Sequence, residues 1–319
     1  MSFKGILGHA GPIQILEAYL RQSRLSGGYL FCGLEGVGKK LAAKAVSKAV
    51  NCLENNIEAC GKCVSCQKIE KNEHPDVRII ESGDDEIKIE DIRQLQKEIS
   101  FRAYEGRVKV FILDNAHRLN PEAANCLLKV LEEPPRHSLI ILITDKPNLL
   151  FKTITSRCKT VKFYPMPRKE LEEVLRSNYA IEPSLAHFLA YFCEGRLGSA
   201  LGLKDTDIIR EKNSVIDKFI LTDSPLFDRG PAQGKDDLRH SLNIIATWFR
   251  DIYLVKIGAS HQELINYDRK DEILKHMGKF TFTELNDILR SVSDSVLYLE
   301  QNINAKLVMH NIGVQLWKA

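Results

Sequence analysis

The chain has 319 residues, of which 44% are hydrophobic and 27% charged, and its formal net charge at pH 7 is +3. The length allows two or three domains with cores of their own and the composition is ordinary for a globular protein, but the net charge is too small to argue for nucleic-acid binding by itself. The N-terminus lacks the apolar stretch of a signal peptide and no run is long enough to cross a membrane, so we expect a cytoplasmic protein.

Apolar, β-rich runs alternate with helical patterns along the first half of the chain, which predicts an α/β fold on a parallel sheet. No internal repeat accompanies this alternation. The predicted strands are Tyr29–Cys32, Val77–Ile80, Val108–Leu113, Leu139–Ile143 and Thr160–Phe163.

The first predicted strand leads into a glycine-rich loop that resembles the phosphate-binding motif G-x-x-x-x-G-K-[ST]. In that motif backbone N–H groups surround a phosphate, the lysine contacts the β- and γ-phosphates, and the final hydroxyl binds Mg²⁺. Here Lys40 occupies the hydroxyl position, and an ammonium cannot ligate a cation. A glycine-rich turn without a phosphate role is the alternative. The predicted phosphate contacts are Gly33, Gly36, Gly38 and Lys39.

Four of the eight cysteines are clustered, with two C-x-x-C steps that share Cys63. In a reducing compartment such clustering favours a metal over disulfides, and four thiolates form the usual set of a closed, structural zinc site. An iron–sulfur cluster and a disulfide pair remain as alternatives. The predicted ligands are Cys52, Cys60, Cys63 and Cys66, and the expected buried cysteines are Cys32, Cys126, Cys158 and Cys193.

Asp114 directly follows the third predicted strand, at the place where a buried parallel strand delivers a carboxylate to the Mg²⁺ of a phosphate-loop site. Working ATPases of this kind usually have a glutamate next, which activates the attacking water. Asn115 stands there instead, and a neutral amide has no useful basicity. Together Lys40 and Asn115 predict that the chain does not hydrolyse ATP on its own.

A helix is predicted from Pro121 to Glu132, with Asn120 as its N-cap and Pro134 and Pro135 beyond its end. One face of this helix is apolar and is expected to lie in the core. That face consists of Ala124, Leu127, Leu128 and Leu131.

Beyond Phe163 the β-rich runs stop and the pattern becomes helical. Residues 171–203 resemble a small helical unit, and residues 222–235, rich in Asp, Gly and Pro, are expected to form a surface loop. The chain is then helical to its end, where Thr281 and Glu284 predict a capping box at the start of a long helix.

Taken together, these segments resemble the delta-prime subunits of the bacterial DNA polymerase III clamp loader. The resemblance covers residues 5 to about 205 and extends more weakly over the helical remainder. It rests on Gly5–His9, Gly28–Gly33, the cysteine cluster, His74–Asp76, Ile89–Arg93, Asp114–His117, Ala124–Pro135 and Thr153–Cys158.

The resemblance implies an AAA+ protein: a P-loop NTPase-type domain with a zinc module over residues 1–165, a helical lid over 166–206 and a helical collar over 207–319. The family's collar joins a ring of five subunits with delta and the gamma/tau ATPases, which opens the sliding clamp and places it on primed DNA. Delta-prime subunits commonly lack working ATPase residues. Active relatives usually place a nucleotide-sensing arginine near Gly198, whereas Arg196 here is out of register.

The resemblance also implies a role for Arg157, which lies between Ser156 and Cys158. Clamp-loader subunits use this sequence to insert an arginine finger into the ATP site of the next subunit, and in well-studied GTPases such a finger is worth about 10³–10⁵ in rate. The alternative is a surface arginine at a strand edge.

Three classes of function follow from these features. The first is a non-hydrolysing subunit that completes a neighbour's active site and binds ATP or ADP weakly or not at all. The second is an active ATPase of gamma/tau type. The third is a zinc-dependent DNA-binding module, but the lysines around the cluster are interspersed with acids rather than with aromatic residues: Lys62, Lys68, Glu70, Lys71 and Glu73.

Overall fold

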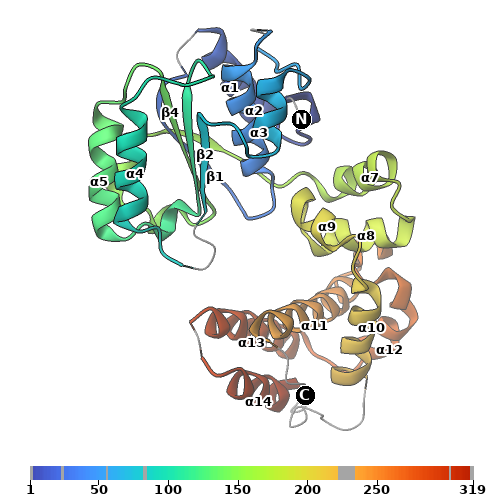
Figure 1. Ribbon diagram of the computed structural model, residues 1–319. Coiled ribbons are helices and arrows are strands. Elements are labelled where there is room, and N and C mark those ends of the chain that lie inside the picture. Colours follow the sequence, from blue (N-terminus) through green and yellow to red (C-terminus); the bar gives the residue numbers. More distant parts are fainter. Residues whose placement is uncertain are drawn as a thin grey trace. The chain divides into compact units, whose positions relative to one another are not determined.

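The computed structural model describes residues 3–22, 25–54, 57–81, 85–221, 234–301 and 303–316, and the predicted loop at 222–235 lies almost wholly outside these ranges. The chain divides into two compact units (Figure 1). The first comprises Met1–Pro167 with Gly195–Ser199, and the second Arg168–Glu194 with Ala200–Ala319.

The first unit is built around a parallel sheet with the strand order β2-β3-β4-β1-β5. All five predicted strands are present, and their ends differ from the predicted ones by no more than two residues. The strands are β1 (Gly27–Cys32), β2 (Val77–Glu81), β3 (Lys109–Asp114), β4 (Ser138–Thr144) and β5 (Lys159–Lys162).

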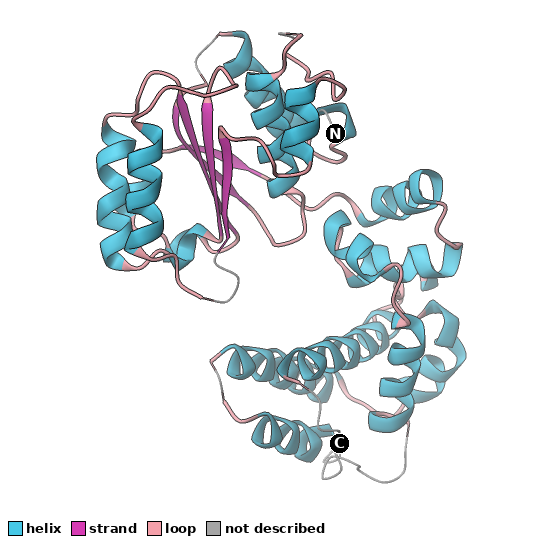
Figure 2. Ribbon diagram, viewed as in Figure 1, coloured by secondary structure: helices cyan, strands magenta, loops and turns pink. Residues whose placement is uncertain are grey.

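Helices cover both faces of this sheet (Figures 1 and 2). One face carries α1 (Ala10–Arg21), α2 (Lys39–Asn51) and α3 (Val64–Glu70), and the other α4 (Ile89–Ile99) and α5 (Pro121–Glu132). Because both faces are buried, the central strands are continuously apolar rather than alternating, as is usual in parallel sheets.

Alternate side chains of β1 pack into two hydrophobic cores, one on each face of the sheet. Tyr29 and Phe31 pack into the cluster that includes Val46 of α2, whereas Leu30 packs into the cluster that includes Leu127 of α5. The predicted apolar face of α5 is confirmed, although Leu128 is only partly buried, and the side chain of Asn120 caps the helix by accepting a hydrogen bond from Ala123 N at 2.8 Å.

All five strands run in the same direction, so their carboxyl ends lie at one edge of the sheet, where parallel α/β sheets place their ligand sites. The loop after β1, Asp114 at the end of β3 and Thr144 at the end of β4 therefore meet at this edge. The short helix α6 (Lys152–Thr155) follows β4 and leads through Arg157 into β5.

Within its described residues, the second unit consists of helices joined by loops and has no strand (Figure 2). Trp248, Phe249 and Leu285 lie in its core, and Thr281 and Glu284 form the predicted capping box. Its helices are α7 (Arg168–Tyr179), α8 (Pro183–Phe192), α10 (Ile208–Phe219), α11 (Lys235–Lys256), α12 (Lys270–Met277), α13 (Phe282–Glu300) and α14 (Ala305–Leu316), while α9 (Leu197–Leu203) has residues in both units.

Short 3-10 helices join several of these elements. The division of the helical part into a lid and a collar stays a prediction, because residues 168–194 group with the C-terminal helices in one unit. Within the described ranges, no helix combines the length and the apolar character needed to cross a bilayer. The 3-10 helices are η1 (Phe3–Gly5), η2 (Ala116–Arg118), η3 (Pro147–Leu149), η5 (His261–Glu263) and η6 (Tyr267–Arg269).

Candidate functional site

The glycine-rich loop lies between β1 and α2, beside a cavity of about 320 Å³. Gly36 and Gly38 have φ angles of 77° and 106°, a left-handed conformation that side chains other than glycine rarely adopt. The cavity is lined by both glycines and by Lys39, Asp114 and Asn115. The structure thus places four of the five predicted contacts around one space, whereas Gly33 does not line it, and a role of these residues in nucleotide binding stays a prediction.

Lys39 is buried and its ammonium is bound to the loop itself. Its Nζ donates to the carbonyl oxygens of Gly33 at 2.5 Å and of Leu34 at 2.7 Å. Burial lowers the pKa of Lys39, while the carboxylates of Asp145 and Asp114 oppose this effect. The residue expected to contact a phosphate is thus engaged with loop carbonyls in the ligand-free chain.

Lys40 lies between two carboxylates. Its Nζ is 2.7 Å from Glu81 Oε1 and 3.3 Å from Asp114 Oδ2. Burial by itself would lower the pKa of Lys40, but the hydrogen bond to Glu81 and the charge of Asp114 raise it, so the ammonium stays charged at neutral pH. The acid that would hold Mg²⁺ in an active relative is here neutralised by a cation belonging to the chain.

Glu81 was missed by the sequence reasoning. It is the last residue of β2 and pairs in register with Asp114, the last residue of β3. The sequence did offer a signal, because Glu81 directly follows a predicted strand. It did not show that β2 and β3 lie next to each other in the sheet.

Asn115 has φ 53° and ψ 46°, a left-handed conformation in which asparagine is favoured over most side chains. Close by, His117 Nδ1 is 3.1 Å from Thr144 Oγ1, and burial lowers the pKa of this histidine. No carboxylate occupies the position after Asp114, where an active relative carries its base.

The start of α9 is fastened to the glycine-rich loop. Gly198 N donates to Gly36 O at 2.7 Å, and a Cβ added to Gly198 would lie only 2.6 Å from the same oxygen. Gly198 also lines the cavity, so the start of α9 contributes to its wall. The close approach of two backbones explains the glycine at this position.

Arg157 lies after α6 and is partly exposed. Its Nη2 is 2.7 Å from Glu132 Oε1, and its Nη1 donates to Thr153 O at 3.0 Å. The backbone of Arg157 is anchored to the core, because Arg157 N donates to Ile154 O and the Ile154 side chain is fully buried. The guanidinium on this anchored turn is partly exposed to solvent.

The four clustered cysteines converge. Their Sγ atoms all lie within 4.8 Å of one another, and each of the eight cysteines in the chain is free of disulfides. A tetrahedral site with Zn–S bonds of about 2.3 Å needs sulfurs about 3.8 Å apart, so a small contraction would complete it. The predicted ligand set fits a zinc ion, and the cluster comprises Cys52, Cys60, Cys63 and Cys66.

Backbone N–H groups point at these sulfurs, as they do where thiolates are held for a metal. Cys60 N lies 3.4 Å from Cys52 Sγ, and Cys63 N lies 3.3 Å from Cys60 Sγ. Burial raises the pKa of the Cys66 thiol to about 12, whereas backbone N–H groups outweigh burial at Cys63 and lower its pKa to about 7.

A polar network that the sequence reasoning missed ties the cysteine module to the sheet. The side-chain oxygen of Asn51 accepts from Arg107 N and Val108 N, and Arg107 donates to Cys52 O. Asp76 accepts three backbone N–H groups at 2.7–2.8 Å, which lower its pKa despite burial. The three N–H groups belong to Tyr104, Glu105 and Gly106.

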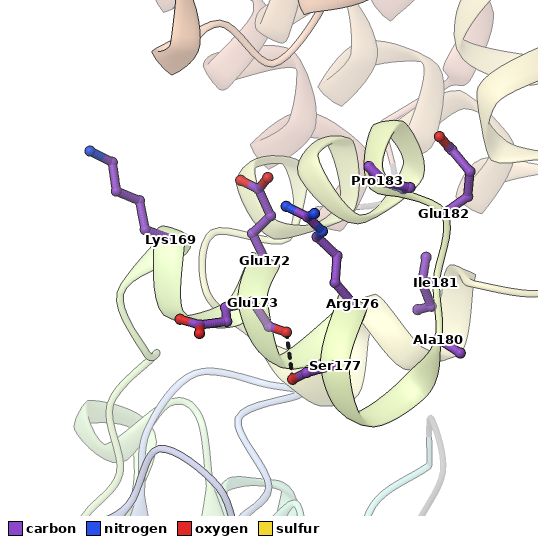
Figure 3. Close-up of a pocket in the computed structure, with 9 residues that line it drawn as sticks. All are labelled: Lys169, Glu172, Glu173, Arg176, Ser177, Ala180, Ile181, Glu182 and Pro183. Atoms are coloured by element: carbon purple, nitrogen blue, oxygen red, sulfur yellow. Dashed lines mark hydrogen bonds between the residues drawn. The ribbon is translucent and has the colours of Figure 1, made fainter.

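A larger and more open hollow, of about 820 Å³, lies in the second unit between α7 and the start of α8 (Figure 3). Glu172, Glu173 and Arg176 all face it, so positive and negative side chains are mixed there. The hollow therefore does not favour either a cationic or an anionic ligand. Ser177 Oγ is bound to the carbonyl of Glu173 at 2.8 Å. None of the predicted site residues lines this hollow.

Comparison with known proteins relates both halves of the chain to one replication system. A family model described as "DNA polymerase III, delta subunit" matches residues 8–167, and its C-terminal counterpart matches residues 224–316. The delta-prime subunit of DNA polymerase III from Bacillus subtilis is 30% identical over 95% of this chain and 94% of its own length.

Two further proteins resemble parts or all of the chain. The tau subunit of DNA polymerase III from Escherichia coli is 36% identical over 65% of this chain, but the match covers only 33% of tau. The crystal structure of a DNA polymerase III gamma subunit-related protein from Thermotoga maritima is 18% identical, with a TM-score of 0.48 over 96% of this chain and 99% of that one.

Proposed function

Because the chain belongs to the delta-prime family of bacterial DNA polymerase III clamp-loader subunits, we propose that it is a non-hydrolysing member of that complex. In this role it assembles with delta and gamma/tau subunits in a five-subunit ring. The ring loads the sliding clamp on primed DNA during replication, in the cytoplasm. The chain's own chemical contribution is Arg157, which reaches the ATP site of the neighbouring subunit.

The ion pairs of Lys40 carry the first part of this proposal. With its ammonium between Glu81 and Asp114, the position of the Mg²⁺ ligands is already occupied by positive charge. A metal ion brought there would be repelled by the ammonium and would lack the hydroxyl ligand. Since Asn115 cannot serve as a base either, a bound nucleotide would meet neither requirement for hydrolysis.

The position of Arg157 supports the second part. It lies on an exposed turn that is anchored by buried Ile154, so a partner can approach its guanidinium without unfolding the chain. Its planar fork suits phosphoryl oxygens, on which negative charge accumulates during transfer. The same exposure means that Arg157 contributes little to the stability of its own unit.

The zinc proposed at the four-cysteine cluster is structural. All four positions of a tetrahedral ion would be filled by Cys52, Cys60, Cys63 and Cys66, which leaves none for a substrate. The ion would hold Cys52 and residues 57–66 in place against α2 and the loop that carries Arg107. It therefore supports the fold of the module and takes no part in the ATP chemistry.

An active ATPase of gamma/tau type is the alternative, and the identity to tau is its support. The two readings differ in one measurable property, which is hydrolysis by the isolated chain. Single-turnover kinetics with excess chain over ATP should give no phosphate release for the proposed role. Release that disappears in Lys39→Ala would establish the alternative.

The test of the finger uses a ring reconstituted from this chain and its gamma/tau and delta partners. Arg157→Ala should lower clamp- and DNA-stimulated ATP hydrolysis while ring assembly and zinc content stay unchanged. Arg157→Lys should fall nearly as far, because a point charge does not reproduce the guanidinium fork. The loss should be partial if other sites in the ring keep their own fingers.

Arg136→Ala is the matched control, since Arg136 is also exposed and also lies at the amino ends of the strands, but it precedes β4, two strands away from the β5 strand that follows Arg157. It should leave the rate unchanged. Unaltered hydrolysis and clamp loading in the Arg157→Ala ring would remove the finger from the proposal and leave the chain an architectural role.

A further inference from the structure

The guanidinium of Arg157 is held on two sides by its own chain. Glu132 Oε1 lies 2.7 Å from Nη2, and Nη1 donates to Thr153 O at 3.0 Å. Nη1 also lies 3.4 Å from Ser156 Oγ. The guanidinium N–H groups that an arginine finger would donate to a phosphate are thus partly engaged by acceptors of the free chain itself.

This arrangement follows from how two helices end. Glu132 is the last residue of α5, which stops before Pro134, and Arg157 follows the end of α6. Leu131 and Ile154 belong to the same core cluster, so the two helix ends are fixed relative to each other. Their polar side chains meet above that core, where 49% of the Glu132 side chain and 36% of the Arg157 side chain remain exposed.

We propose that Glu132 restrains Arg157 in the free chain and competes for its guanidinium with the phosphate of the partner's nucleotide. Engagement of the finger is then an exchange, in which a phosphate replaces the Glu132 carboxylate on Nη2. Both groups accept bidentate or paired hydrogen bonds from a guanidinium, so the exchange conserves bonds. This inference rests on the proposed function of Arg157 and adds the residue that regulates it.

The strength of the restraint is bounded by its exposure. An ion pair in contact with solvent is worth little, and a loss of this size changes a rate by no more than about five-fold. Glu132 therefore delays the finger without blocking it. A residue that instead oriented Arg157 toward the phosphate would have the opposite effect on the rate when removed.

The test measures kcat and KM for ATP in the reconstituted ring, with clamp and primed DNA present. Glu132→Gln should raise kcat by up to about five-fold and leave KM unchanged, because the freed guanidinium acts on the transferring phosphoryl group. Glu132→Asp, which keeps the charge, should stay closer to the unmutated rate. The gain should shrink at high salt, where the ion pair is already screened.

Glu133→Gln is the matched control, because it removes the same charge from the next position along an exposed helix end. It should leave kcat unchanged, which separates the pair from a general effect of charge. In an Arg157→Ala background Glu132→Gln should have no effect, as a double-mutant cycle requires of two residues that act together.

The possible outcomes test the restraint by Glu132 separately from the proposed finger role of Arg157. If Arg157→Ala lowers the rate but Glu132→Gln lowers it too or leaves it unchanged, the restraint is refuted and the finger stands. A gain that persists in the Arg157→Ala background also refutes the restraint. If Arg157→Ala has no effect, the finger and the restraint are refuted together.

Discussion

Single residues decide what the glycine-rich loop can still do. The loop keeps the glycines at 36 and 38 and their left-handed backbone, so the shape of a phosphate cradle persists. Its electrostatics have changed, because Lys40 adds a fixed positive charge where an active relative places a hydroxyl. We therefore expect this loop to bind nucleotide weakly at most and to support no turnover.

Replacing Lys40 by threonine should make nucleotide binding depend on Mg²⁺. The substitution removes the ammonium, frees the carboxylates of Glu81 and Asp114, and supplies the missing hydroxyl ligand. ADP should then bind about ten-fold more tightly with Mg²⁺ than with a chelator, a difference of about 1.4 kcal/mol. Calorimetric titration of ADP under both conditions measures this ratio.

Lys44→Thr is the control for this experiment, since it removes the same charge one turn further along α2. Neither variant should hydrolyse ATP, because Asn115 remains and offers no base. The same Mg²⁺ ratio in the unmutated chain as in Lys40→Thr would contradict the assignment of Lys40 as the substitute for the metal.

Elements are held together in this chain by polar contacts as well as by apolar cores. The cysteine module is the clearest case, because α3 is short and the segment before it has little apolar content. Asn51 and Arg107 hold it where a hydrophobic core is too small, and we propose that a zinc ion bound by the four cysteines adds to this support. Such modules depend on their metal for order.

Removing zinc should therefore loosen the module and leave the sheet folded. After treatment with a strong chelator, hydrogen exchange should speed up at least about ten-fold in residues 57–70, a local loss of about 1.4 kcal/mol or more. The β1 and β4 amides should keep their protection. Cys63→Ser should bind no zinc, whereas Cys126→Ser, outside the cluster, should keep about one equivalent.

A second polar contact joins α10 to η6 within the helical unit. The side chain of Lys212 is fully buried, and its Nζ lies 2.5 and 2.6 Å from the two oxygens of Asp268 and 5.4 Å from the ring of Phe188. Burial lowers the pKa of Lys212 more than Asp268 raises it. For buried ion pairs the cost of removing the charges from water can exceed their mutual attraction.

The two partners should respond unequally to mutation. Asp268→Asn leaves the buried ammonium without its carboxylate and should destabilise the chain by about 3 kcal/mol, the lower end for a broken buried pair because Asp268 is partly exposed. Lys212→Met removes the buried charge and should be close to neutral. Urea unfolding monitored in the helical unit compares them, and equal losses in the two variants would contradict this asymmetry.

For the molecule as a whole, patterns local in sequence predicted the fold well. The five strands, the α5 helix with its Asn120 cap and the capping box at Thr281 each depend on neighbouring residues. The cysteine cluster was predictable for the same reason, since its ligands lie within one short segment.

Contacts between distant segments could not be predicted in this way. The pairing of Lys40 with Glu81 depends on β2 lying next to β3 in one register, and that of Arg157 with Glu132 depends on how α5 and α6 pack. The support that Asp76 gives to residues 104–106 requires a loop to fold back over the sheet. These contacts follow from tertiary structure, which residue spacing alone does not determine.

Both units should lose stability together as the pH falls below neutral. Burial lowers the pKa of His74 and His117 in the first unit and of His276 in the second. A histidine whose folded pKa is depressed contributes stability above its unfolded value, about 6.5, and loses it as the pH falls through the folded value. Each such group adds up to about 1.4 kcal/mol of destabilisation per pH unit in that window.

The thermal midpoint should accordingly decline between about pH 6.5 and pH 5, in the range where most carboxylates are still ionised. His117→Gln should make the decline shallower, because one of these three imidazoles no longer takes up a proton on unfolding. His137→Gln, at an exposed position, is the matched control and should leave the slope unchanged. Zinc content is measured at each pH, since loss of the metal in acid would also lower the midpoint. A midpoint that stays constant from pH 7.5 to pH 5 with zinc retained would show that these histidines are protonated equally easily in the folded and unfolded chain.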